Sequence, residues 1–269
     1  MLKSKNEEVV KEFYALKKQL DLLLEDRQNT WGYLQNYLYF TYIPVFNYTE
    51  AIIILCNSGK YNAASVLLRS LFEAHINIIY HQVGDSEKKL ATSVSTQLAE
   101  FRRSFEGVSK LIEEHPSLVS VDEKSLFNQK YLKKAFNKID SDLAKLSLSN
   151  KPVDGKKRIR LIDKAKDCDD AKIFSIQVGH FQRMYHVIYR QLSPAVHLDI
   201  GGLDSFVDKS GDGRFFTREM YNGDILIIQA IEICVALVKD LYEHGVLKED
   251  ISRTVNNVEN LIGKSSAYE

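Results

Sequence analysis

The chain has 269 residues, of which 45% are hydrophobic and 27% are charged, a composition that excludes a disordered protein and is typical of a globular one. Lysine and arginine together number 36, as do aspartate and glutamate, so the formal net charge at pH 7 is zero. This balance excludes binding of nucleic acid through an overall basic surface, and any such contact would need a local basic patch.

The cysteine pattern and the N-terminal sequence indicate a reducing, cytoplasmic location. Cys56, Cys168 and Cys234 are far apart and show no CxxC spacing, so neither a disulfide framework nor a zinc site is expected. The N-terminus lacks the apolar core of a signal peptide, and the longest apolar run, around residues 51–56, is too short to span a bilayer. We therefore expect no membrane association.

Hydrophobic residues recur at spacings of three and four along most of the chain, which predicts amphipathic helices and an all-α fold. The chain has only four prolines, and Pro44 is expected to kink or divide its helix. The predicted helices cover residues 6–28, 31–57, 60–82, 86–115, 122–147, 171–192, 218–244 and 248–262.

Residues 84–170 are more polar than the segments on either side of them. We interpret this region as a helical insertion in a single domain that spans residues 1–269. The core of that domain is expected to come from residues of about 31–82 and 171–245.

The predicted helix over residues 60–82 is apolar on nearly its whole circumference, which indicates a central, buried helix. Arg69, Glu73 and Asn77 nevertheless follow one another at intervals of four residues, and His81 continues the row. Buried charges cost several kcal/mol unless they are paired, by order of magnitude. The row is therefore either a structural ion pair of Arg69 with Glu73 or the back wall of a polar site.

The end of the helix predicted over residues 171–192 is the strongest candidate for a functional site. Arg190 precedes a helix stop at Pro194, and His197 follows seven positions after the arginine. A permanently charged guanidinium suits a phosphate, and an imidazole with a pKa near neutrality suits proton transfer. A structural alternative is that Arg190 complements the helix dipole and His197 bonds to loop backbone.

The segment YRQLSPAVHLD, together with the upstream helix AASVLLRSLFEAHINIIY, resembles the HEPN superfamily of small helical domains. It is most similar to an uncharacterised branch with a Tyr-Arg-x-Leu-Ser-x-x-Val-His signature. HEPN proteins carry an Arg-x4–6-His motif at a helix end, which Arg190 and His197 match with six residues between them. The resemblance covers residues of about 35–82 and 171–245, and it implies a HEPN-like antiparallel helical bundle.

The resemblance implies a metal-independent endoribonuclease that needs no cofactor. In such an enzyme the ribose 2′-hydroxyl attacks the adjacent phosphorus, and the products are a 2′,3′-cyclic phosphate and a 5′-hydroxyl. His197 would act as general base or acid, and Arg190 would stabilise charge on the phosphoryl oxygens. Many HEPN families have Asn, Asp or His after the motif arginine, whereas this chain has Gln191, which cannot act as an acid or base.

Further residues are candidates for supporting roles. Arg69 and Glu73 match the polar row of that branch. Tyr189 and Ser193 could bond to phosphate or sugar, or could be a packed aromatic ring and a helix-end hydroxyl. His186 lies one helical turn before Arg190 and could either support the site or be a surface histidine.

The resemblance also bears on partners and on biological role. HEPN ribonucleases commonly act as homodimers, and they include toxins and antiviral effectors, so RNA, a second copy and an antitoxin or defence-system protein are the implied partners. A stripe of apolar residues could serve the dimer or pack within the chain: Val178, Phe181, Tyr185, Ile188 and Leu192. The alternative function is a non-catalytic HEPN-like module that binds RNA, a nucleotide or a protein.

A cluster of basic residues follows the loop at residues 149–155 and is the best local candidate for contact with an RNA backbone. Acidic residues follow closely, so the cluster could equally be a solvated helix face. Its members are Lys156, Lys157, Arg158 and Arg160.

Residues 208–219 match an EF-hand calcium loop at its positions 1, 3, 5, 6 and 12. Position 9 is Phe216, which is a poor ligand, and the preceding sequence does not resemble an entering helix. We therefore favour a turn that leads into the next helix over a calcium site. No other metal-binding spacing is present among the histidines.

Overall fold

The computed structural model describes most of the predicted helical segments. The described residues are 6–24, 31–118, 130–131, 133–134, 136–138, 140–141, 159–171, 180–189, 222–249 and 251–265, together with the backbone of 207–209 and 215–217. The chain divides into two compact units, residues 1–83 with 161–269 and residues 84–160.

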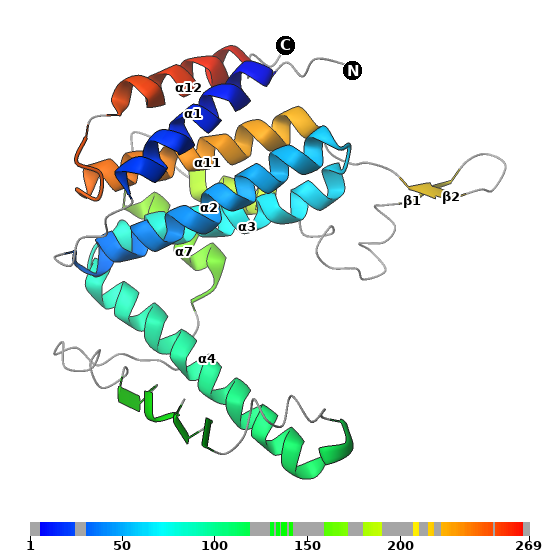
Figure 1. Cartoon of the computed structure of the whole chain (residues 1–269), viewed down its shortest axis with the longest axis vertical. Coiled ribbons are helices and arrows are strands. Elements are labelled where there is room, and N and C mark those ends of the chain that lie inside the picture. The colour runs from blue at the N-terminus through cyan, green and yellow to red at the C-terminus, as the bar shows by residue number, and fades with distance from the viewer. Residues whose placement is uncertain are drawn as a thin grey trace. The chain divides into compact units, whose positions relative to one another are not determined.

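Over the described residues the fold is all-α, as the sequence predicts, apart from one short pair of strands (Figure 1). The first unit contains α1 (Glu7–Leu23), α2 (Tyr33–Asn57), α3 (Tyr61–Gln82), α7 (Leu161–Asp170), α8 (His180–Arg183), the π-helical turn η2 (Met184–Tyr189), α11 (Gly223–Glu243) and α12 (Ser252–Ser265). The second unit contains α4 (Ser86–Glu114) and the short 3₁₀ turn η1 (Pro116–Leu118).

The core of the first unit is formed by α2, α3 and α11, which pack against one another and run side by side in Figure 1. The prediction of a central third helix is confirmed, because α3 also contacts α7 and η2. Leu68, Leu71 and Ile76 of α3 are fully buried. Each such side chain contributes roughly 1.5–3 kcal/mol relative to leaving it in water.

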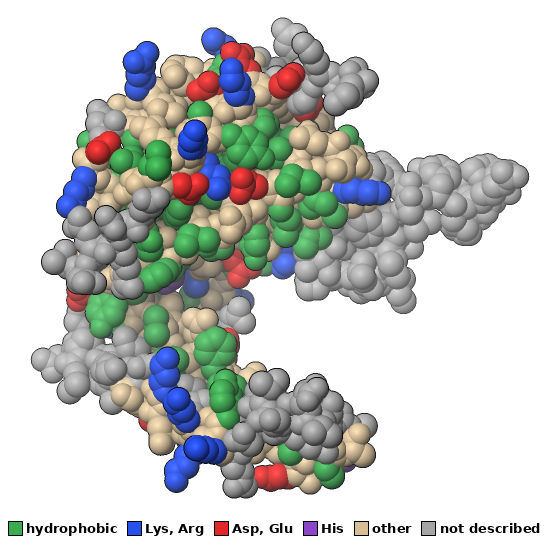
Figure 2. All heavy atoms as spheres, in the orientation of Figure 1, with side chains coloured by type: hydrophobic (Ala, Val, Ile, Leu, Met, Phe, Trp, Pro, Cys, Tyr) green, Lys and Arg blue, Asp and Glu red, His purple; other side chains and the backbone are tan. Residues whose placement is uncertain are grey.

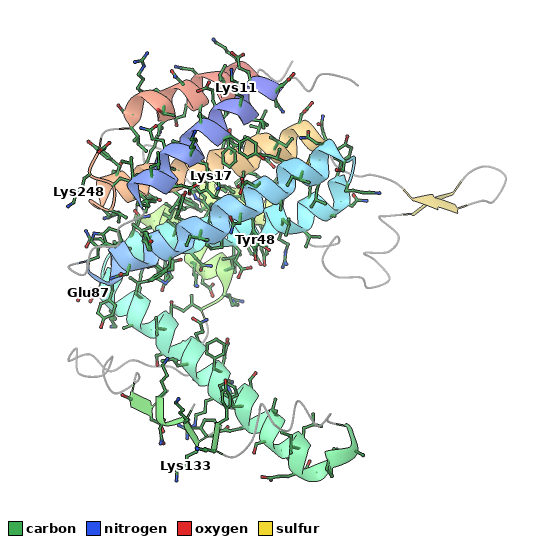
Figure 3. All side chains as sticks on the ribbon, in the orientation of Figure 1. Lys11, Lys17, Tyr48, Glu87, Lys133 and Lys248 are labelled. Atoms are coloured by element: carbon green, nitrogen blue, oxygen red, sulfur yellow. The ribbon has the colours of Figure 1, made fainter. Side chains whose placement is uncertain are left out.

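The outer helices α1 and α12 pack against each other, and both bury an apolar face. Phe13 of α1 stacks on Phe46 of α2, with 5.5 Å between ring centroids. Lys17 of α1, labelled in Figure 3, lies 3.7 Å from a carboxylate oxygen of Glu50 on α2. These contacts make α1 part of the first unit's core, although the core predicted from the sequence comprises only residues of about 31–82 and 171–245.

The boundary of the insertion also differs from the prediction. Polarity predicts that residues 84–170 form the insertion, but α7 belongs to the first unit and packs against α3. Ala165 and Cys168 of α7 are buried. Most of their neighbours in the sequence are charged, so the polarity of the segment does not indicate that this helix packs on the core.

Helix α2 continues through Pro44 without division and is followed by Gly59, whose φ of +71° fits the expected helix-ending role. By length and composition α2 is apolar enough to cross a membrane, but 39% of its most apolar window is buried inside the protein. A core helix of a folded domain has these same properties.

Residues 193–217 fall between two predicted helices, and part of this segment forms a strand pair in the described backbone. Strands β1 (Val207–Lys209) and β2 (Phe215–Thr217) pair antiparallel, with Asp208 opposite Phe216. Paired strands differ from the helix–loop–helix of a calcium-binding hand.

In the second unit, α4 contacts the helical residues of the 130–141 segment. Arg102 lies 2.6 Å from Asp140, and Phe105 forms edge-on ring contacts with Tyr131 and Phe136. This unit therefore has an aromatic contact of its own.

Candidate functional site

Several of the predicted site residues lie outside the residues that the structure describes. These are Arg190, Gln191, Ser193 and His197, together with Lys156, Lys157 and Arg158. Arg160 is described and exposed. The structure does describe the helix that leads to Arg190 and the predicted supporting residues on α3.

Tyr189, the last residue of η2, is held by Arg69 of α3. Nη2 of Arg69 donates a hydrogen bond of 2.7 Å to the Tyr189 hydroxyl, and the guanidinium carbon lies 4.4 Å from the centroid of the Tyr189 ring. A guanidinium at this distance from an aromatic ring gains a cation–π attraction as well. The predicted Arg69–Glu73 ion pair is therefore replaced, in the part of the chain described, by a contact between residues 120 positions apart.

Glu73 lies beside the same tyrosine. The pKa of Tyr189 is raised, first by desolvation and then by the negative charge of Glu73, whereas Arg69 acts in the opposite direction. The prediction that Arg69 and Glu73 form the wall of a polar site is therefore compatible with the geometry, with Tyr189 as the residue that joins them. Nε of Arg69 is buried and has no hydrogen-bond partner among the described residues.

The turn that carries Tyr189 has π-helical rather than α-helical hydrogen bonding over residues 184–189. π-helical turns are rare and are frequent at functional sites. Tyr185 and Tyr189 stack within it, with 5.3 Å between centroids and 18° between ring planes. His186 is exposed, and its ring contacts Tyr185 edge-on at 5.2 Å, so it is linked to Tyr189 through Tyr185.

The start of this helix is fixed by Asp169 of α7. Its carboxylate accepts hydrogen bonds from the backbone N–H groups of Phe181 and Gln182, at 2.8 and 3.0 Å. A carboxylate at this position satisfies donors that the first helical turn leaves free. The segment from residue 180 to 189 is thus held at its beginning by α7 and at its end by α3.

The remaining members of the polar row on α3 have other partners. Asn77 accepts a 2.7 Å hydrogen bond from Nζ of Lys164 on α7. His81 is buried, and its ring contacts Tyr37 of α2 at 4.8 Å. Arg69 and Glu73 are therefore the two members of the row that meet the candidate site.

A second polar feature was not found from the sequence. A cavity of about 630 Å³ lies among α3, α8, α11 and α12, and both His75 and His180 line it. The pKa of His75 is lowered to about 4 by burial and, to a smaller extent, by His180. The signal that could have located this cavity is the set of charged residues on the otherwise apolar α11, which includes Glu232 and Asp240.

No group of three or more His, Cys, Asp or Glu side chains that could hold a metal ion occurs among the described residues. On the face drawn in Figure 2, the cationic and anionic side chains of the first unit are interspersed.

Replacing Tyr189 by phenylalanine is expected to lower the free energy of unfolding by about 1–2 kcal/mol, because a donor of Arg69 then loses its acceptor. Chemical denaturation of both proteins would measure the difference. The matched control is Tyr242→Phe on α11, whose side chain is exposed and whose replacement should change stability by less than about 0.5 kcal/mol. Equal losses in the two variants would contradict an anchoring role for the Tyr189 hydroxyl.

Comparison with known proteins identifies a similarity to a protein family. The model of a protein family whose function is unknown matches residues 35–215, which is more than half of the chain. The match begins in α2, includes α3, α7 and η2, and spans Arg190 and His197. No curated protein and no solved structure matches the chain.

Proposed function

The chain belongs to DUF5677, a family of unknown function, and we propose that it is a metal-independent endoribonuclease. The ribose 2′-oxygen forms a bond to the adjacent phosphorus while the bond from phosphorus to the 5′-oxygen breaks. His197 takes the 2′-hydroxyl proton or supplies one to the leaving 5′-oxygen, and Arg190 stabilises negative charge on the phosphoryl oxygens. The products carry a 2′,3′-cyclic phosphate and a 5′-hydroxyl.

The observation that carries this proposal is the anchoring of Tyr189. Its side chain is bonded to Arg69 and lies beside Glu73, and Arg190 is the next residue in the chain. Catalysis by positioned groups requires that they stand on a rigid element, since small displacements cost large factors in rate. The stack of Tyr185 on Tyr189 and the carboxylate of Asp169 add to the fixation of this helix.

The chemistry of Arg69 supports an anionic ligand near this helix end. Its buried Nε has no partner among the described residues, and charge-assisted hydrogen bonds from guanidinium groups suit phosphate oxygens. The motif shared with HEPN proteins supplies the rest of the proposal. We extend it to the partners implied there: RNA held near residues 156–160, a homodimer, and an antitoxin or defence-system protein in the cytoplasm.

The proposal is tested with the purified full chain on single-stranded RNA in the presence of EDTA. We expect cleavage products that end in a 2′,3′-cyclic phosphate, and no cleavage of the same sequence made with 2′-deoxyribose. The His197→Ala protein, purified in parallel, controls for contaminating ribonucleases. Equal cleavage by both proteins, or none by either, would overturn the nuclease proposal, and RNA binding without cleavage would favour a non-catalytic binding module.

A further inference from the structure

The cavity among α3, α8, α11 and α12 is lined by acidic groups on an apolar floor. Glu232, Asp240 and Glu243 lie on one face of α11, and Glu259 faces them from α12. The apolar part of the wall consists of Ile79, Phe181, Val235, Ala236 and Ile262. A volume of about 630 Å³ is in the range of sites that hold small organic ligands.

The cationic residues that line the cavity do not neutralise the charge of its carboxyl groups. Lys239 is the one lysine or arginine among the cavity's described lining residues, and its Nζ lies 2.6 Å from a carboxylate oxygen of Glu259. His75 has a pKa of about 4, and the pKa of His180 is lowered mainly by desolvation, so both rings are neutral at pH 7. Three carboxyl groups on α11 therefore face the cavity without a basic residue of the lining to pair with them.

Asp240 is the most buried of these acidic residues and is only 2% exposed. Gln82 interacts with this carboxyl group, but its Oδ2 is buried and has no hydrogen-bond partner among the described residues. Nδ1 of His75, which also lines the cavity, is buried without a partner as well. Buried polar atoms without partners are rare and destabilising in proteins, and they often mark the place of a ligand, an ion or water. The desolvated carboxyl of Asp240 thus points to a ligand that carries hydrogen-bond donors.

We propose that this cavity binds an aliphatic polyamine, with one ammonium group on Asp240, a second on Glu232 or Glu243, and the methylene chain along the apolar wall. Glu232 and Glu243 are eleven residues apart on α11, which corresponds to about 16 Å along the helix. An extended chain with several charges matches carboxylates spread over that length, whereas a single ion would meet only one of them. An ammonium group also brings three donors, which suits a carboxyl group whose Oδ2 has no hydrogen-bond partner among the described residues.

The test is isothermal titration calorimetry of the full chain with spermidine at low ionic strength, where charge interactions are least screened. We expect one site per chain, and weaker binding by Asp240→Asn on the order of ten- to a hundredfold, because a charge-assisted bond is lost. Butylamine, which has one ammonium group, should bind markedly more weakly than spermidine. No binding of spermidine, or equal binding by wild type and Asp240→Asn, would overturn the proposal.

Two glycine variants test whether the polyamine binds in the cavity without changing any charged residue. Gly263 of α12 lines the cavity, and a Cβ added there would meet no atom within 4 Å, so Gly263→Trp is expected to fill the site without disrupting the helix. Gly107 of α4 is equally unobstructed and belongs to the other unit, which makes Gly107→Trp the matched control. Binding should be lost at least tenfold in the first variant and kept in the second, and equal effects would contradict binding in the cavity. This binding uses neither Arg190 nor His197, so it stands or fails independently of the nuclease.

Discussion

Replacing His197 by alanine is expected to lower the rate of RNA cleavage by about a hundredfold to ten-thousandfold, because the variant has no group to transfer the proton of the 2′-hydroxyl or of the leaving oxygen. Replacing Arg190 by alanine should lower it by about a hundred- to a thousandfold, since charge on the phosphoryl oxygens loses one preorganised donor. Single-turnover rates on a labelled oligonucleotide measure both losses without interference from product release.

The control for the histidine variant is His115→Ala. His115 follows α4 in the second unit and is exposed, and the proposed chemistry does not use it. This variant should retain the wild-type rate within about twofold. A wild-type rate in His197→Ala would contradict a role for its imidazole, whereas loss of activity in the His115 variant would indicate damage to the fold. The double variant Arg190→Ala, His197→Ala should lose less than the product of the two single losses, as groups that act together do.

Local periodicity carried enough information to predict most of the described helices, although not α7, and the central place of α3. Its apolar residues cover nearly the whole circumference, and only a helix surrounded by others can bury such a surface. The partner of Arg69 could not be predicted in the same way. Glu73 stands at the favourable spacing of four residues, but Tyr189, which is 120 residues away in sequence, receives the hydrogen bond. Pairings of this kind depend on how two helices pack, which a single sequence does not state.

The cavity was missed for a related reason. Charged residues that recur along α11 look like the solvated side of an amphipathic helix, and the packing of α12 determines which of them are covered. Asp240 is 2% exposed, whereas its neighbour Lys239 is exposed. Likewise, Ala165 and Cys168 attach α7 to the core from within a highly charged segment, so a boundary drawn from polarity placed that helix in the insertion.

Replacing Asp240 by asparagine is expected to stabilise the protein at pH 8, by up to about 4 kcal/mol. Burial raises the pKa of Asp240 from 3.8 to about 7, whereas a side-chain interaction with Gln82 acts in the opposite direction. Between about pH 4 and pH 7 the unfolded carboxyl is ionised while the folded one keeps its proton, so stability falls as the pH rises and stays low above pH 7. Each pKa unit corresponds to about 1.4 kcal/mol, and an amide of the same shape avoids this cost.

Urea denaturation of wild type and variant at pH 4, 6 and 8 measures the effect, with Asp170→Asn on the exposed end of α7 as the control. The difference between wild type and Asp240→Asn should grow from near zero at pH 4 to its full size at pH 8. His75, His180, Glu232, Lys239, Glu243 and Glu259 face Asp240 in both proteins, so their own titration contributes equally to the two and cancels in the difference. A variant less stable than wild type at pH 8 would mean that the carboxylate already has a partner. Saturating spermidine should narrow the difference in stability between the two proteins, because it binds the wild type more tightly than the variant and therefore stabilises the wild type more.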